Sequence, residues 1–304
     1  MPIDDVTVRR AVADDAPTIA GLRAAAVPYL VMTAAGMRAR LVGPRAETGW
    51  LASVHGTPVG YAVHGSATDG IARGTVVVRP QHRRLGVGSA LLDVLEDDLI
   101  AAGTSALAGV ADDEAGRAFA VARGAAIGRE HRFAVADLAA APEPPATPGV
   151  QVLPLADVVT PRAVWTVNAA AAPDDPSGLS VDGPYEEWLA DEWSSPDHAL
   201  DLGVAAAVGG EIVAFTLVLA DRERGAIWSA MTGVHPVHRG RGLARLVKAH
   251  AFRAARDAGL TQAFTANDAA NAPMLAVNTW LGYRPAARAW SVHQILDRAD
   301  GLRH

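Results

Sequence analysis

Apolar and polar residues follow two periods along this chain, and these periods predict strands and helices in alternation. Runs of β-branched residues predict strands, and apolar stripes with a 3.6-residue period predict helices. In the first half the pattern predicts a strand at 6–8, a helix at 16–26, a hairpin at 50–54 and 59–63, a strand at 75–78 and a helix from about 87 to 102. Val87, Leu91, Leu95 and Leu99 form the stripe of that last helix, and Gly103 is typical of its end.

The second half repeats this order of elements. It predicts a strand at 150–153, a hairpin at 204–208 and 212–219, a strand at 226–234, a helix from about 243 to 258, a short strand at 262–265, a helix at 273–280 and a strand at 289–295. Between the halves, residues 140–149 contain four prolines, which suit neither a helix interior nor a central strand. We therefore expect an α/β protein with domains at 1–140 and 150–304, joined by a proline-rich linker at 141–149.

The two halves share one motif as well as their order of elements. Residues 76–88 read VVVRPQHRRLGVG, and residues 232–244 read TGVHPVHRGRGLA. A shift of 156 residues places Pro80 on Pro236 and Gly86 on Gly242. One fold has therefore been duplicated within the chain.

In each copy the motif lies between a predicted strand and the start of a predicted helix. Glycines let backbone N–H groups approach a ligand, and the first helical turn adds unpaired donors and a partial positive charge. Adjacent arginines add full charges, so the pattern favours a pyrophosphate site. A plain tight turn is the alternative. A Rossmann-type loop is disfavoured, because it would follow the first strand of its domain and carry a third glycine.

Composition narrows the chemistry and the compartment. The 304 residues include no cysteine, which excludes disulfides, thiolate metal ligands and a cysteinyl intermediate. Residues 1–5 lack signal-peptide features, and no uncharged apolar run reaches about 18 residues, so we expect a cytoplasmic protein without a membrane partner. The net charge of −6 argues against nucleic acid as a partner. No His, Asp and Glu cluster has ligand spacing, so no metal is expected.

Both motifs resemble the acyl-CoA loop of the GNAT superfamily of N-acetyltransferases, whose signature is Gln/Arg-x-x-Gly-x-Gly/Ala. Residues 83–88 read RRLGVG and residues 239–244 read RGRGLA, and both match it. The tandem arrangement is similar to that of mycothiol synthase. The resemblance implies two GNAT-like domains, each a mixed, mostly antiparallel central sheet flanked by helices. It also implies acetyl-CoA as cosubstrate.

The resemblance further implies which residues hold acetyl-CoA. In the family the loop amides bind the pyrophosphate, and the preceding strand end contacts pantetheine and the thioester. The implied residues are Val234, Arg239, Gly240, Arg241, Gly242, Leu243, Ala244, Asn267 and Asn271 in the second copy, and Val78, Arg83, Arg84, Gly86 and Gly88 in the first.

Beyond the loops the two copies differ. Many family members carry an asparagine and, seven residues later, a tyrosine that protonates the CoA thiolate. The second copy has Asn271 and then Asn278, whereas the first has Asp113 and Ala120. We therefore expect the second copy to be catalytic, with Asn278 as a hydrogen-bond donor, and the first to be a degenerate or supporting copy. Helix capping and turn bonding are the alternative role for these asparagines.

An amine must lose a proton before it attacks. The resemblance implies that a carboxylate, often through a water molecule, is the base. Glu187 and Asp191 are the candidates, four residues apart in an acidic, tryptophan-rich segment. A solvated helix anchored by Trp188 is the alternative. The expected function is acetyl transfer to an amine of a small molecule or peptide by direct attack in a ternary complex. A CoA-binding regulatory pseudoenzyme, a non-catalytic interaction scaffold and a homodimer stay open.

Overall fold

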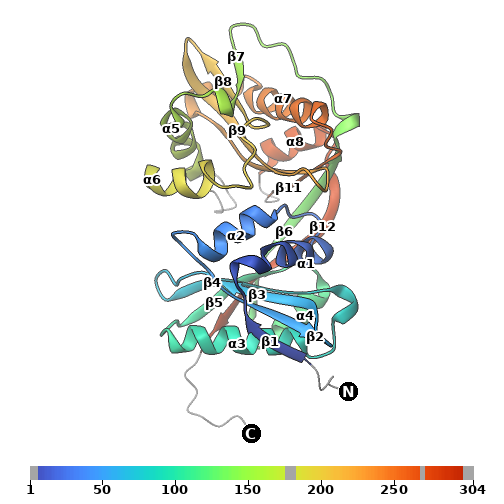
Figure 1. Ribbon diagram of the computed structural model, residues 1–304. Helices are drawn as coiled ribbons and strands as arrows, with labels where there is room; N and C mark the ends of the chain where they lie inside the picture. Colours follow the sequence, from blue (N-terminus) through green and yellow to red (C-terminus); the bar gives the residue numbers. More distant parts are fainter. Residues whose placement is uncertain (1–5, 175–182, 268–270, 297–304) are drawn as a thin grey trace. The chain divides into compact units, whose positions relative to one another are not determined.

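The computed structural model describes residues 6–174, 183–267 and 271–296 (Figure 1). The chain divides into two compact units. Unit 1 contains Met1–Pro28, Thr33–His131 and Arg288–His304, and unit 2 contains Tyr29–Met32 and Arg132–Ala287. Along the described ranges, no helix has both the length and the apolar character needed to cross a membrane.

Unit 1 is a mixed sheet with helices on both faces. Its elements are β1 (Val6–Arg10), α1 (Ala16–Ala26), α2 (Ala34–Val42), β2 (Thr48–Val54), β3 (Thr57–His64), β4 (Ile71–Val78), α3 (Val87–Ala101), β5 (Ala106–Ala111), α4 (Glu114–Ala122) and the start of β6 (Ala126–Asp137). The sheet order runs β1-β2-β3-β4-β5-β12, and only β4 and β5 pair in parallel. This arrangement confirms the mostly antiparallel sheet that the sequence predicted.

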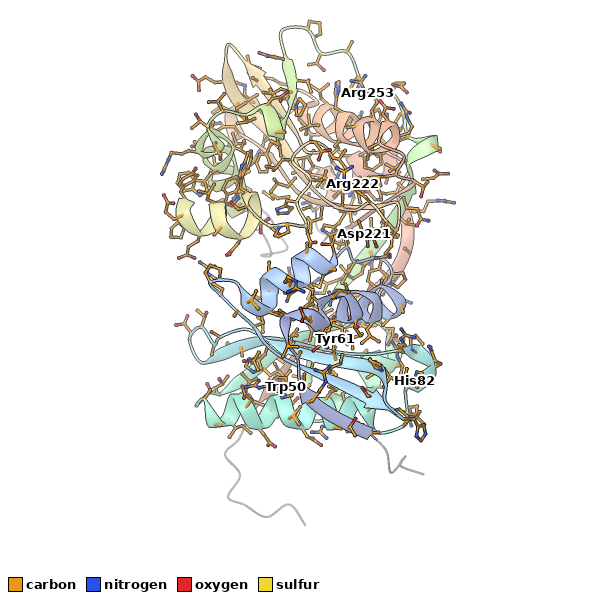
Figure 2. The ribbon with its side chains drawn as sticks, viewed as in Figure 1. Trp50, Tyr61, His82, Asp221, Arg222 and Arg253 are labelled. Carbon is orange, nitrogen blue, oxygen red and sulfur yellow. The ribbon has the colours of Figure 1, made fainter. Side chains whose placement is uncertain are left out.

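The core of unit 1 forms where α3 packs on the sheet. Leu91, Leu95 and Leu99 of the predicted stripe are buried there together with Val87. On the other face, Tyr61 of β3 (labelled with Trp50 in Figure 2) is fully buried and accepts a hydrogen bond from Arg23 of α1 at 3.0 Å. Alternate residues of β3 therefore pack against helices on opposite faces of the sheet.

Unit 2 repeats this plan. Its elements are β7 (Gln151–Pro154), α5 (Pro161–Ala171), α6 (Tyr185–Trp188), β8 (Val204–Val208), β9 (Glu211–Asp221), β10 (Ala226–Val234), α7 (Leu243–Asp257), β11 (Gln262–Asn267), α8 (Ala272–Trp280) and the start of β12 (Arg284–Ile295). The sheet order is β6-β11-β10-β9-β8-β7, with β10 and β11 parallel. α7 packs on one face, and α5 and α6 contribute Val164, Val167 and Trp188 to a separate core cluster.

The last strand of each repeat belongs to the sheet of the other unit. β12 follows the second repeat, yet its residues from Trp290 to Ile295 pair with β5 of unit 1. β6 follows the first repeat, yet its residues from Arg132 to Asp137 pair with β11 of unit 2. The compact units thus differ from the continuous domains 1–140 and 150–304 expected from the sequence, because strand pairing decides membership and local patterns do not encode it.

Unit 2 buries the only lysine of the chain. Lys248 of α7 is 2 % exposed, and its Nζ donates to Ser229 Oγ at 2.8 Å and lies 5.6 Å from the ring centre of Tyr283. Thr265 Oγ1 donates to the carbonyl oxygen of Ser229 at 3.1 Å. Burial lowers the pKa of Lys248 to about 7, because a low-polarity interior disfavours the ammonium form. Ser229, Lys248, Thr265 and Tyr283 are called the Lys248 cluster below.

Cleavage within the proline-rich segment is expected to leave the two fragments bound to each other. Each fragment then supplies a strand to a sheet formed mainly by the other, so separation requires breaking strand pairs in both units. A protease site can be inserted between Pro145 and Pro148. Size-exclusion chromatography of the cut and the uncut protein without denaturant then measures whether the fragments stay together. Elution as two separate fragments would contradict the strand exchange.

The side chain of Lys248 is expected to titrate near pH 7 in the folded protein. Since the chain has one lysine, labelling with ¹³C-lysine gives a single side-chain signal whose midpoint NMR can follow with pH. A midpoint near 7 agrees with burial of the amine, and a midpoint near the ordinary value of 10.5 contradicts it. Lys248→Met, in which the signal should vanish, is the assignment control.

Candidate active site

The central parallel strands of each unit pair over only part of their length. In unit 1, β4 pairs with β5 from Ile71 to Arg73, although β4 continues to Val78. In unit 2, β10 pairs with β11 from Ala226 to Trp228, although β10 continues to Val234. A ligand that enters beyond the end of this ladder can reach backbone donors and acceptors on both strands.

The loop after the shortened ladder ends in a left-handed glycine in both units. Gly86 has a φ of 85° at the N-cap of α3, and Gly242 has a φ of 77° at the N-cap of α7. Neither helix receives a side-chain cap there, so its first N–H groups are oriented toward an incoming anion. Two residues earlier, Arg84 has a φ of 65° where Gly240 has a φ of 75°. This conformation costs arginine on the order of 1 kcal/mol, and such strain concentrates at functional sites.

One arginine ties each loop to the strand before it. Arg83 Nε donates to the carbonyl oxygen of Val78 at 3.4 Å, and Arg239 Nε donates to that of Val234 at 3.3 Å. The second contact differs, because Arg83 Nη1 lies 2.6 Å from a carboxylate oxygen of Asp113, whereas Arg239 Nη1 lies 2.6 Å from one of Asp174. Val78 and Val234 thus lie at strand ends, as the sequence indicated. The two loops have the same geometry, but a different carboxylate contacts the loop arginine in each unit.

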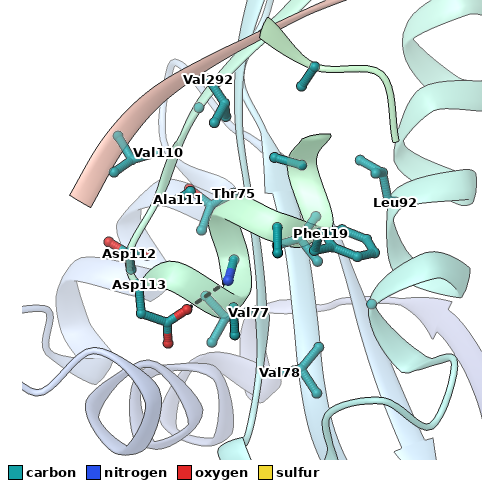
Figure 3. A pocket seen from close by; sticks show the side chains of 18 of the residues that line it. Thr75, Val77, Val78, Leu92, Val110, Ala111, Asp112, Asp113, Phe119 and Val292 are labelled. Atoms are coloured by element: carbon teal, nitrogen blue, oxygen red, sulfur yellow. Dashed lines mark hydrogen bonds between the residues drawn. The ribbon is translucent and has the colours of Figure 1, made fainter. Parts of the chain in front are cut away.

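A cavity of about 440 Å³ lies beside the loop of unit 1 (Figure 3). Its walls come mainly from β4, β5, α3 and α4, with further residues from α1 and β12. Val78, Arg83, Arg84, Gly86 and Gly88, the residues predicted for the first copy, all line it. The structure therefore brings this predicted set together around one space.

Two adjacent carboxylates stand at the end of β5 in this cavity (Figure 3). Asp113 caps α4 by accepting a hydrogen bond from Gly116 N at 2.7 Å. Burial tends to raise its pKa, but that hydrogen bond and Arg83 outweigh burial and hold the pKa below its ordinary value. Burial raises the pKa of Asp112 to about 6, against the lowering effect of Arg23. Asp112 was not among the predicted site residues, because β5, the strand that it follows, was not predicted from the sequence.

The predicted asparagines of unit 2 have distinct positions. Asn271 is the N-cap of α8 and accepts a hydrogen bond from Met274 N at 3.2 Å. Asp113 has the same capping role in α4, so the two positions correspond as the sequence indicated. Asn278 is buried within α8. Asn267 is the last residue of β11, and its side chain lies outside the described part of the structure.

The central strand of unit 2 contains a bulge that unit 1 lacks. The register of β10 against β9 shifts between Ser229 and Thr232, next to the end of the parallel ladder. The register of β4 against β3 is continuous over the corresponding stretch. A bulge bends a strand and redirects its peptide groups, so the two units differ in backbone geometry next to the end of the parallel ladder.

The acidic segment of unit 2 is helical, but it does not form one regular α-helix. α6 ends at Trp188, which is buried, and a π-helical turn continues from Leu189 to Trp193. Glu187 and Asp191 therefore do not share the i,i+4 face of one α-helix, and both side chains are exposed. The residues 175–182 that precede this segment lie outside the described structure.

A third carboxylate of this segment is less exposed than the two predicted ones. Burial, and then the charge of Asp191, raise the pKa of Glu192. His198 contacts the backbone carbonyl of Glu192 through Nδ1, and its Nε2 lies 3.6 Å from Glu192 Oε2. Burial lowers the pKa of His198 to about 4, so the imidazole is neutral near pH 7. Glu192 therefore joins Glu187 and Asp191 as a candidate proton acceptor.

Each loop thus offers amide groups and arginines to an anionic group, and a wall of unit 1 offers a carboxylate that ionises near neutral pH. Within the ranges that the structure describes, no three His, Asp or Glu side chains gather as metal ligands would. The arrangement suits a long ligand with a phosphate end and a reactive end near the strand ladder.

Comparison with known proteins agrees with this geometry. A model of the acetyltransferase (GNAT) family matches residues 27–125 and 167–283. A tandem GNAT protein from the clavulanic acid biosynthesis pathway is similar in structure, with a TM-score of 0.75, 20% identity and coverage of 97% of this chain and 100% of that chain. A GCN5-related N-acetyltransferase from Sphaerobacter thermophilus has a TM-score of 0.71, 18% identity and 99% coverage of both chains. A search of curated protein sequences gave no match.

The two kinds of comparison carry different weight. The family model matches more than half of the chain and includes both glycine loops. The solved structures share the tandem fold at low sequence identity, so they support the architecture and not a substrate. The chain therefore belongs to the GNAT acetyltransferase family and carries two copies of its fold.

Proposed function

We propose that this protein is an acetyl-CoA-dependent N-acetyltransferase that acts on an amine of a small molecule or peptide. The observation that best supports this is the repeated pairing of a shortened parallel ladder with a left-handed glycine at the next helix start, in a chain of the GNAT family. A helix start suits the pyrophosphate of CoA, and the exposed strand edges suit the amides of pantetheine.

In the proposed reaction the amine nitrogen attacks the thioester carbonyl carbon in a ternary complex. The C–N bond forms, the C–S bond breaks, and the sulfur leaves with the electron pair as CoA thiolate. One amine proton passes to a base. Backbone N–H groups beyond the end of the ladder stabilise the charge that develops on the carbonyl oxygen. Since the chain has no cysteine, a cysteinyl acyl-enzyme takes no part.

We assign the transfer step to unit 2 and a second CoA site to unit 1. In unit 2 the loop residues 239–244, with Val234, Asn267 and Asn271, are proposed to hold CoA, and Asn278 to donate a hydrogen bond near the leaving sulfur. The proposed base is Glu192, with Glu187 and Asp191 as the other candidates, because Glu192 combines partial burial with a raised pKa.

The alternative is a CoA-binding regulator without acetyltransferase activity. Asn278 favours it, because an amide is not a useful acid at neutral pH. Release of CoA in the presence of an amine panel separates the two functions, since a regulator releases no more CoA with amines than without them.

Replacing Gly242 with valine is expected to remove one of two acetyl-CoA sites and to lower amine-dependent CoA release at least about ten-fold. Valine is strained at a φ of 77°, although the space around Gly242 is open, so the loop itself must change. Calorimetric stoichiometry and a thiol reagent measure both effects, and the cysteine-free chain gives the reagent no background. Gly86→Val is the matched variant in unit 1 and should lose one site but keep CoA release. Equal loss of release in both variants would contradict the assignment to unit 2.

Glu192→Gln is expected to lower kcat about 100-fold near pH 7, the usual effect of removing a general base. Glu186→Gln is the control, since this exposed side chain lies on the same segment and its partner is Arg162, 3.6 Å away. Glu187→Gln and Asp191→Asn are measured beside it, and a loss confined to one of them moves the base to that residue. Unchanged kcat in all three carboxylate variants would rule out a base from this segment.

A further inference from the structure

The Lys248 cluster fills the space behind the end of the parallel ladder in unit 2. Ser229 and Thr265 directly follow Trp228 and Phe264, the last pair of that ladder. Lys248 is the sixth residue of α7, and Tyr283 follows the left-handed Gly282 after α8. All four cluster side chains are buried, and they contact one another through the Lys248 and Thr265 hydrogen bonds and the packing of Lys248 on Tyr283.

Unit 1 has smaller or apolar residues at the same four positions. Gly74 and Gly109 directly follow the last pair of its ladder. Leu92 is the sixth residue of α3, and Ala125 follows the left-handed Gly124 after α4. All four line the 440 Å³ cavity. The volume that polar side chains occupy in unit 2 is therefore open in unit 1.

Close packing of the backbone maintains this difference. A Cβ atom on Gly109 would lie 2.8 Å from the carbonyl oxygen of Gly74, a contact that would force the strands to shift. In unit 2 the corresponding Thr265 has its hydroxyl bonded to the corresponding carbonyl of Ser229. Gly109 thus leaves unit 1 open at the point where Thr265 and its partners close unit 2.

The inner wall of the unit 1 cavity is apolar. Leu92, Leu107, Phe119 and Val292 line it, three of them labelled in Figure 3. Gln294 also lines it, but its Nε2 donates to Glu96 Oε1 at 2.7 Å. Glu96 also pairs with Arg123 at 3.1 Å, so the amide and the carboxylate behind the wall already have partners. The wall favours an uncharged hydrocarbon over a dicarboxylic acyl group.

We propose that unit 1 is a site for acyl-CoA thioesters with a saturated acyl chain longer than acetyl, and that the Lys248 cluster restricts unit 2 to short acyl groups. The acyl chain of the thioester lies along the apolar wall between Leu92 and Ala125, and the CoA phosphates lie at the loop around Gly86. This specificity rests on the proposed CoA binding at both loops. The two copies would then differ in the acyl-CoA thioester that they bind, and not only in the catalytic residues that they retain.

Calorimetry with CoA, acetyl-CoA, butyryl-CoA and hexanoyl-CoA tests the proposal in two variants of the full chain. Gly242→Val leaves unit 1 as the intact site, and butyryl-CoA should then bind about 15-fold tighter than acetyl-CoA, because each of its two additional methylenes contributes about four-fold when buried. Gly86→Val leaves unit 2 as the intact site, where a longer acyl chain should give no gain in affinity. Equal affinity for all thioesters in Gly242→Val, or an equal gain in both variants, overturns the proposal. Failure of CoA itself to bind Gly242→Val refutes the proposed CoA site of unit 1 instead.

A substitution that fills the cavity of unit 1 tests which wall the acyl chain contacts. Ala125→Tyr, made in the Gly242→Val background, places in unit 1 the residue type that unit 2 carries at this position, and should abolish the ratio between butyryl-CoA and acetyl-CoA affinity. Ala126→Tyr adds the same volume at the next, exposed residue, outside the cavity lining, and should keep that ratio. If Ala125→Tyr does not fold, Ala125→Leu replaces it. If the ratio of butyryl-CoA to acetyl-CoA affinity is unchanged in the folded Ala125 variant, the acyl chain does not lie along this wall, and this part of the proposal is overturned.

Discussion

The short ladder between the two parallel strands is the constraint on which both sites depend. In each unit the ladder ends after three residue pairs, while the strands continue. The end of the ladder opens the space next to the loop, and the left-handed Gly86 or Gly242 then turns the chain into a helix whose first amides are oriented toward that space. A ladder of full length would occupy the same backbone groups and close the site.

The duplication has also coupled the two units through their strands. β6 and β12 each leave the repeat that precedes them in sequence and complete the sheet of the other unit. Each unit therefore requires the end of the other repeat, although each has its own core. The two loops share one geometry, whereas the residues behind the ladder differ, with Gly74 and Leu92 in unit 1 and Ser229 and Lys248 in unit 2. Such a difference allows one copy to specialise while the other keeps the fold.

Strong local patterns made much of this structure predictable from the sequence. The apolar stripe of α3, the helix α7, the two hairpins and both glycine loops lie where apolar periodicity and turn chemistry placed them. β5 was not predicted, because its Ala-Leu-Ala-Gly-Val-Ala run has few β-branched residues. The exchange of β6 and β12 was not predictable, because it depends on pairing between distant segments. Asp112, Glu192 and the open wall of unit 1 depend on burial in three dimensions, which spacing alone does not determine.

A crystal structure of the protein with acetyl-CoA would show whether each ladder end and glycine loop form a CoA site. We predict CoA in both units, with the pyrophosphate against the first turns of α3 and α7 at Gly86 and Gly242, and the thioester beyond the end of each parallel ladder. CoA bound away from these two helix starts, or bound with its phosphates at neither glycine, would contradict the account.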